Sequence, residues 1–506
     1  MRRLTASVAA LACGFLWANE ARAQGGRGGA DWMTAGGDAQ RSSWIPTDPK
    51  ISVNRIQNPG FQVAWKIKLT GDPSVAATLD RYIGYRGFRS FALVGSRSGD
   101  ITAFDTDLGR VEWKKSLAAG TTPRGAAGPC SGGMTANLTR PAGTGFAALP
   151  AGRGGAGGGR GNAAKSTVGS PEEGAVTIAE IAARAAAAAA APPRPPAPAP
   201  AAAGRGQGEY NPFAARASFL DAISSDGMFH AMYISNGDEP VPPMPFLPAN
   251  SNAQGFIVVN NVAYAATSGG CGCAPNGLWA LDLGSKEVAH WTPVTGDIAG
   301  SVGAAFGPDG VPYVATTGGD LAALEPKTLQ VKVIYHSASQ AFASSPVVFE
   351  YDKKTMIAAA TADGHVELVD AVSMTGAAFP AVVSGALASW QDAGGAHWLV
   401  APSHNSISSW KVTGEAGAAN LQPGWTSREI ASPLAPVIVN GVVFTVSNSA
   451  QPVVYALDGV TGKEIWNSGK ALSAPIRNGG LSVIGSQLYL GASDGTFYAF
   501  GFPIEH

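Results

Sequence analysis

Charged side chains are scarce in this chain of 506 residues. Asp, Glu, Lys and Arg together make up 14% of it, and the formal net charge is −1. Soluble proteins are charged at roughly a quarter of their positions, and proteins that bind nucleic acids cluster Lys and Arg on one face. The composition therefore excludes a basic binding surface, and we expect no nucleic-acid partner.

Three further signals are missing. The sequence contains no C-x-x-C-H motif, so no covalent haem is encoded. Its seven His residues show no metal-ligand spacing, which leaves both the metal ligands and the catalytic residues unknown. Beyond the N-terminus, no apolar run approaches the roughly 20 residues of a membrane helix, so we expect no membrane span.

The first 23 residues have the features of a cleaved export signal. An Arg pair precedes an apolar stretch over 4–17, and the small-residue pattern Ala21-Arg22-Ala23 follows. We predict cleavage after Ala23 and a periplasmic or secreted mature protein. A lipoprotein signal ending at Cys13 is the alternative, which is disfavoured because Cys13 lies inside the apolar run.

A second atypical region spans about 143–212. It contains AGRGGAGGGRGN, a run of alanines and PPRPPAPAP. Such sequence buries too little apolar surface to offset the entropy lost on ordering. We predict a disordered insertion in a loop.

The rest of the chain carries a repeat of a small residue, a bulky residue and an acidic residue, as in ALDGVTGKEIW from Ala456. After the first interval, which holds the insertion, the spacings run from 40 to 49 residues. The acidic position or its equivalent falls at Asp105, Tyr233, Asp282, Glu325, Asp370, Trp410, Asp458 and Gly501. This period is typical of four-stranded propeller blades. Small polar turns such as Ser493-Asp494-Gly495, between alternating strands, indicate that the units are hairpins.

Eight units predict an all-β, eight-bladed β-propeller of antiparallel four-stranded blades. We expect a lead-in segment over 24–61 and the propeller over 62–506. The strand over 62–69 should pair with the last blade, because a ring closed in this way leaves no exposed sheet edge. A seven-bladed ring, in which the weak unit around Trp410 is a loop, is the alternative.

Three units end on a Trp that could wedge against the next blade. In the repeat around Asp458, Gly462 permits a left-handed turn, and the Asp can accept hydrogen bonds from that turn. The residues expected to dock blades together are Asp105, Gly109, Trp113, Asp282, Trp291, Asp458, Gly462 and Trp466.

These motifs resemble the tryptophan-docking repeat of the pyrroloquinoline quinone (PQQ) dehydrogenases and, more distantly, of the outer-membrane assembly scaffold lipoproteins. The segment from Trp32 through Gly36-Gly37-Asp38-Ala39-Gln40-Arg41 to Trp65 is similar to the opening of the quinoprotein dehydrogenases. The scaffolds lack this opening. The resemblance therefore implies the propeller fold and favours the dehydrogenase branch.

The resemblance also implies a site. Family members hold PQQ in the central channel beneath a disulfide of adjacent cysteines, with a calcium ion and an aspartate base. Here the nearest counterpart of the cysteine pair is Cys271-Gly272-Cys273, so Cys271 and Cys273 are the candidates for the loop near a quinone. No segment matches the calcium ligands or the base.

The mature chain would keep Cys130, Cys271 and Cys273. A Cys271–Cys273 disulfide would be strained and could be redox active, whereas a bond from Cys130 to either of the two would staple loops together. We favour the structural staple, because disulfides of exported proteins are mostly structural.

Two functions remain open at this stage. The first is a quinoprotein dehydrogenase that oxidises an alcohol or sugar with PQQ and calcium and passes electrons to a separate acceptor such as a cytochrome. The second is a propeller without cofactor that binds protein partners or serves envelope assembly. Fold alone does not separate them.

Overall fold

The computed structural model describes residues 31–84, 87–117, 130, 132–149, 219–337, 341–414, 419–476 and 480–503. The predicted export signal over 1–23 and the part of the predicted insertion over 150–212 lie outside the described residues. No helix formed by the described residues is long and apolar enough to cross a membrane.

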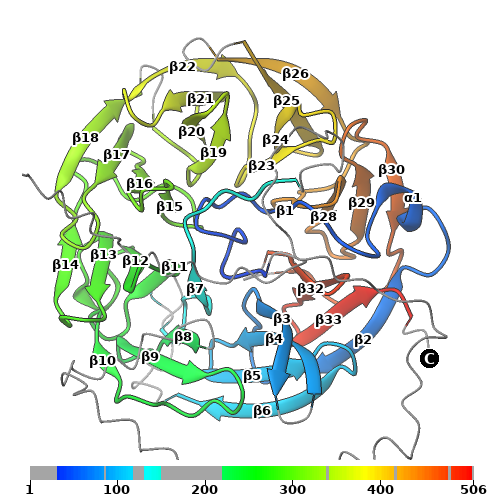
Figure 1. Ribbon diagram of the computed structural model, residues 1–506, viewed down its shortest axis with the longest axis horizontal. Coiled ribbons are helices and arrows are strands. Elements are labelled where there is room, and N and C mark those ends of the chain that lie inside the picture. The colour runs from blue at the N-terminus through cyan, green and yellow to red at the C-terminus, as the bar shows by residue number, and fades with distance from the viewer. Residues whose placement is uncertain are drawn as a thin grey trace, which may run out of the picture. The chain divides into compact units, whose positions relative to one another are not determined.

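Eight sheets follow one another around a ring in chain order (Figure 1). We number them as blades 1 to 8, beginning with the sheet that contains β3. The predicted eight-bladed all-β propeller is thereby confirmed. The unit around Trp410 forms β25 (Ile407–Thr413) inside a complete four-stranded blade, so the seven-bladed alternative is wrong.

Four blades are antiparallel sheets of four strands consecutive in sequence. Blade 1 contains β3 (Ala77–Gly84), β4 (Gly87–Gly95), β5 (Asp100–Asp105) and β6 (Arg110–Ser116). Blade 4 contains β15 (Ala305–Phe306), β16 (Pro312–Ala315), β17 (Asp320–Leu324) and β18 (Val331–His336). Blade 5 contains β19 (Val347–Tyr351), β20 (Lys354–Ala360), β21 (His365–Asp370) and β22 (Thr375–Pro380). Blade 6 contains β23 (Ala388–Gln391), β24 (His397–Pro402), β25 and β26 (Asn420–Thr426).

Three blades have a strand number other than four. Blade 2 has β8 (Phe219–Ile223), β9 (Met228–Tyr233) and β10 (Met244–Pro245), with a single bridge from Thr139 to Asp221 at its inner edge. Blade 3 has β11 (Asn252–Val259), β12 (Val262–Ser268), β13 (Gly277–Asp282) and β14 (Val288–Trp291), and β7 (Pro141–Ala142) adds to it in parallel. Blade 7 has β27 (Val437–Val439), β28 (Val442–Val446), β29 (Val454–Asp458) and β30 (Glu464–Asn467), and β1 (Trp44–Ile45) adds in parallel. Segments crossing the middle of the ring thus cover inner strand edges that would otherwise lack partners.

Blade 8 closes the ring as predicted. It contains β31 (Ser482–Ile484), β32 (Gln487–Gly491) and β33 (Thr496–Gly501), and β2 (Gln62–Lys68) pairs with β33 as the outermost strand. The register runs from Gln62 opposite Gly501 to Lys68 opposite Thr496. A strand from the N-terminal part of the chain and the last described strand are therefore held in one sheet. A four-residue helix, α1 (Val53–Ile56), leads into β2.

The core is divided among the blade junctions. Eight apolar clusters are present in the described part of the chain, and each combines side chains from two neighbouring blades. One example joins blades 8 and 1, where the Phe104 and Phe497 rings stack with centroids 5.7 Å apart. Each blade buries both faces against its neighbours, which explains why its middle strands are almost continuously apolar.

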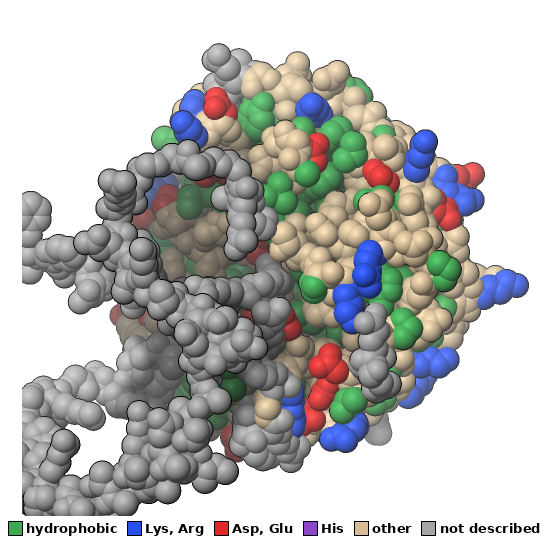
Figure 2. All heavy atoms as spheres, turned by 45° about the vertical axis from the view of Figure 1, so that its right-hand side comes forward, with side chains coloured by type: hydrophobic (Ala, Val, Ile, Leu, Met, Phe, Trp, Pro, Cys, Tyr) green, Lys and Arg blue, Asp and Glu red, His purple; other side chains and the backbone are tan. Residues whose placement is uncertain are grey.

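The distribution of charged side chains on the surface agrees with the net charge of −1. On the face shown in Figure 2, Lys and Arg side chains lie singly or in small groups among Asp, Glu and uncharged groups. This arrangement gives no extended basic patch on that face.

Candidate functional site

The lead-in segment crosses the middle of the ring (Figure 1). Its carbonyls accept hydrogen bonds from the inner strands of four successive blades. The donor and acceptor pairs are Phe306 N to Ala39 O at 2.9 Å, Val348 N to Gln40 O at 3.0 Å, Ser389 N to Ser42 O at 2.9 Å and Ile438 N to Ser43 O at 2.8 Å. We call residues 31–45 the plug, because they occupy the place of an open channel.

Arg41 anchors the plug. Its side chain is almost fully buried, and its guanidinium donates to Ala304 O at 2.9 Å, Ala35 O at 2.7 Å and Gly255 O at 2.8 Å. Burial lowers the pKa of Arg41 to about 9, which leaves the group charged at neutral pH. The arginine of the G-G-D-A-Q-R opening therefore has a structural role in blades 3 and 4.

Side chains of the plug face two cavities, and its backbone is not a regular strand, because Arg41 and Ser43 have positive φ. Asp38, Gln40, Ser42 and Trp44 line a cavity of about 830 Å³ beside blades 5 and 6, which we call the blade-5/6 cavity. Ser43 and the earlier plug residues Trp32, Ala35 and Gly36 line a second cavity of about 460 Å³, which we call the funnel. The first cavity lies where inner strands β19 and β23 end, and the second where the inner strands begin. The plug separates the two.

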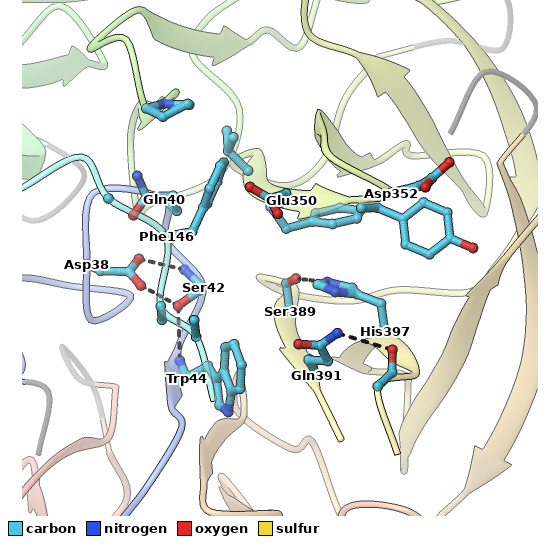
Figure 3. A pocket seen from close by; sticks show the side chains of 18 of the residues that line it. Asp38, Gln40, Ser42, Trp44, Phe146, Glu350, Asp352, Ser389, Gln391 and His397 are labelled. Atoms are coloured by element: carbon cyan, nitrogen blue, oxygen red, sulfur yellow. Dashed lines mark hydrogen bonds between the residues drawn. The ribbon is translucent and has the colours of Figure 1, made fainter. Parts of the chain in front are cut away.

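One wall of the blade-5/6 cavity comes from the plug (Figure 3). Asp38 accepts hydrogen bonds from Ser42 through both carboxylate oxygens, one from the backbone N–H at 2.9 Å and one from the hydroxyl. Burial raises the pKa of Asp38, and the bonds from Ser42 oppose that rise. Gln40 is 1% exposed, and its amide nitrogen donates to Thr144 O at 2.8 Å. Its Oε1 has no hydrogen-bond partner among the described residues.

The segment over 143–149 completes this wall. Phe146 packs against the apolar cluster between blades 4 and 5, and Thr144 donates to Pro308 O at 2.9 Å. The first residues of the predicted insertion are thus positioned against the propeller.

The opposite wall comes from blades 5 and 6 (Figure 3). His397 Nε2 and the Ser389 hydroxyl are 2.7 Å apart, and both side chains are buried. The Phe349 ring stacks on His397 with centroids 4.5 Å apart. Burial lowers the pKa of His397 to about 4, so the imidazole is neutral at pH 7.

The charged side chains among the described residues that line the cavity are all acidic. Asp38, Glu350 and Asp352 line it, and no Lys or Arg of the described residues does. Among the described residues, Glu350 and Asp352 have no ion-pair partner. The nearby Lys354 pairs instead with Asp370, at 3.4 Å.

The funnel has a different character. Among the described residues that line it, Arg97 is the only basic one and Asp72 the only acidic one, and most other polar groups are amides and hydroxyls. The Arg97 Nε atom is buried without a hydrogen-bond partner among the described residues.

The structure joins Cys130 to Cys271 and leaves Cys273 as an exposed free thiol. The strained Cys271–Cys273 alternative is therefore not the arrangement found. Gly272, between the two, packs against the backbone of Asn250, two residues from the funnel residue Asn252. The staple thus lies close to the rim of the funnel.

The residues expected to dock blades lie at blade junctions. Asp458 accepts hydrogen bonds from Val460 N and Thr461 N, both at 2.9 Å, and Asp105 and Asp282 accept equivalent bonds. Trp113 donates to Ile234 O of the next blade at 2.7 Å. Trp466 contacts Phe500 of blade 8 edge to face, and Trp291 packs against the cluster between blades 3 and 4. Gly109 and Gly462 have positive φ and also receive a tryptophan ring from the preceding blade.

The quinone–calcium pair of the family can be tested against these cavities. PQQ carries carboxylates that need basic partners, and calcium needs a cluster of oxygen ligands with several carboxylates. In the described part of the chain, the funnel offers Arg97 but a single carboxylate, and the blade-5/6 cavity offers carboxylates but no basic residue. No three side chains of His, Cys, Asp or Glu gather into a metal site within the described ranges. The residues of neither cavity fit the pair.

Known structures share the fold. A quinohemoprotein alcohol dehydrogenase from Comamonas testosteroni is 11% identical over 94% of this chain and 81% of its own, with a TM-score of 0.52. A europium-containing methanol dehydrogenase is 11% identical over 94% of this chain and 98% of its own, with a TM-score of 0.54. BamB from Moraxella catarrhalis is 12% identical over 88% and 99%, with a TM-score of 0.51. At such identity the likeness shows the fold alone.

No family model matches the sequence, and no curated protein matches it significantly. The choice between an enzyme and a binding protein therefore depends on the site.

Proposed function

We propose that this chain is an exported binding propeller and not a dehydrogenase of the quinone–calcium type. The observation that carries the proposal is the division of charged groups. The one basic residue of the funnel, Arg97, and the carboxylates of the blade-5/6 cavity lie on opposite sides of the plug. A quinone with its calcium ion would need both sets in one place.

The plug supports the same conclusion. Its backbone is hydrogen-bonded to blades 4 to 7, and the Arg41 guanidinium ties it to blades 3 and 4. Moving it aside to join the two cavities would break all of these bonds, and each buried group left without a partner costs about 1–3 kcal/mol. A rigid ring with two separate faces suits the binding of partners.

A quinoprotein dehydrogenase that oxidises an alcohol or sugar is the second candidate. The unpartnered Arg97 Nε in the funnel and the nearby Cys130–Cys271 staple favour it. In that case PQQ would supply the redox chemistry, Arg97 would hold one of its carboxylates, and electrons would leave to a separate cytochrome.

We also propose that the chain works in the periplasm or outside the cell, after removal of residues 1–23. The Cys130–Cys271 disulfide supports this location, because such bonds persist in oxidising compartments.

Titration of the mature protein with PQQ, with and without calcium, tests the proposal. We expect either no saturable binding or weak binding that calcium leaves unchanged and that Arg97→Ala removes. Calcium-dependent saturation with a rise in Tm would overturn the proposal in favour of the dehydrogenase.

A further inference from the structure

We infer that the blade-5/6 cavity binds a small organic cation, an ammonium group carried on an apolar or aromatic body. The inference goes beyond the proposed function because it names a small-molecule ligand. It does not depend on what occupies the funnel, which lies on the other side of the plug.

The size and walls of the cavity suit such a ligand. Its volume of about 830 Å³ lies in the range of small-molecule sites, about 300–1,000 Å³. Three apolar aromatic rings from separate parts of the chain line it, those of Trp44, Phe146 and Phe349. Figure 3 shows Phe146 and Trp44 on the plug side, facing the side chains of Ser389 and His397 across the cavity. Aromatic faces attract cations that lie within about 6 Å of the ring centre.

The charged groups that line the cavity favour a positively charged ligand. Figure 3 shows the Glu350 side chain directed toward Phe146, into the space between the walls. Glu350 and Asp352 have no basic partner in the described chain, whereas Asp38 is hydrogen-bonded to Ser42 and interacts with the charge of Arg41. His397 adds no opposing charge, because it is neutral at pH 7. An anion would meet three carboxyl groups and no basic group.

One buried atom in the cavity wall lacks a hydrogen-bond partner among the described residues, and it is an acceptor. Only 1% of the surface of Gln40, in the cavity wall, is exposed. Its Oε1 lacks a hydrogen-bond donor among the described residues. A buried acceptor without a donor is unfavourable. Because Oε1 is shielded from solvent in this conformation, a ligand reaches it only after the Gln40 side chain turns toward the cavity, and an ammonium group then offers the donor that a carboxylate or phosphate lacks.

Three probes of one shape and different charge test the inference: benzylammonium, benzyl alcohol and benzoate, each titrated calorimetrically into the mature protein at pH 7. We expect saturable binding of benzylammonium, at least tenfold tighter than benzyl alcohol, and no binding of benzoate. The affinity should fall as salt is raised. Equal affinity for the ammonium and the alcohol, tighter binding of benzoate, or no binding of any probe would overturn the inference.

Two variants locate the site. Glu350→Gln, at an exposed position that disturbs no described bond, should weaken benzylammonium about fivefold, as expected for an exposed charge pair. Glu429→Gln, also exposed but outside the cavity, is the matched control and should leave affinity unchanged. Equal effects of the two variants would show that the probe responds to overall charge, and would contradict the assignment.

Discussion

Trp65, on the strand that closes the ring, lies against Gly109 in the turn of blade 1. Its indole Nε1 donates to Thr106 O at 2.9 Å, and a Cβ placed on Gly109 would lie 2.5 Å from the indole Cγ. The same pairing joins Trp113 to Gly237 and Trp425 to Gly462. A tryptophan on an outermost strand thus docks onto a glycine turn of the next blade.

Gly109→Ala should destabilise the protein by roughly 2–3 kcal/mol, because the added methyl group collides with the Trp65 ring and the backbone has positive φ. Gly441→Ala is the control. Gly441 also has positive φ, but nothing lies within 4 Å of an added Cβ, so a loss of about 1 kcal/mol is expected. Urea unfolding measures both, and equal losses would show that the tryptophan contact is unimportant.

Cys130→Ser and Cys271→Ser should each lower stability by roughly 2–5 kcal/mol, since the bond they remove closes a loop of 141 residues. Cys273→Ser should leave the Tm unchanged, because Cys273 is free and exposed. Thermal unfolding under non-reducing conditions distinguishes the pairings. A loss on Cys273→Ser together with an unchanged Cys130→Ser would assign the bond to Cys271 and Cys273 instead.

His397 should make stability pH-dependent. Its folded-state pKa of about 4 lies below the ordinary 6.5, so the unfolded chain binds the proton more readily. The contribution is therefore fully present above pH 6.5 and is lost as the pH falls from 6.5 toward 4, by about 3 kcal/mol in total. Urea unfolding of the wild type and His397→Gln at pH 7, 5.5 and 4 should show a shallower decline in the variant. His404→Gln, at an exposed position, should keep the wild-type slope, and identical slopes in all three proteins would contradict the prediction.

Arg41→Lys should destabilise the protein by roughly 3 kcal/mol or more. A single ammonium group cannot reproduce the forked hydrogen bonds to Ala304, Ala35 and Gly255, and acceptors would be left unpaired. Arg428→Lys, whose exposed pairing with Glu464 tolerates either cation, is the matched control. Similar Tm values for the two variants would indicate that the plug is not anchored through Arg41.

The repeat predicted the ring, but only part of its docking. The spacing of the acidic positions and the strand over 62–69 are local patterns, and they were sufficient for eight blades and for closure through β33. The docking tryptophans Trp65 and Trp425 were missed. Trp65 precedes the repeats. Trp425 lies 15 residues after Trp410, whereas in the three recognised units the Trp lies 8 or 9 residues after the acidic position.

The cavities could not be predicted. Gln40 meets blade 4 through a contact 266 residues away in sequence, and no local pattern indicates such a pairing. Asp38, Gln40 and Ser42 share one face of the plug, but Arg41 and Ser43 are polar as well, so no polar–apolar alternation marks that face in the sequence. Glu350 and the Ser389–His397 pair gave no motif, because they come together only when blades 5 and 6 are adjacent.

The ratio of the PQQ dissociation constants measured without and with calcium tests the central claim most directly. If the groups needed by the quinone and by its metal are separated by the plug, calcium adds nothing: either the ratio is close to one, or no saturable binding is measured with or without calcium. A ratio of about ten or more, corresponding to about 1.4 kcal/mol of coupling, would mean that one site holds both and would contradict the account.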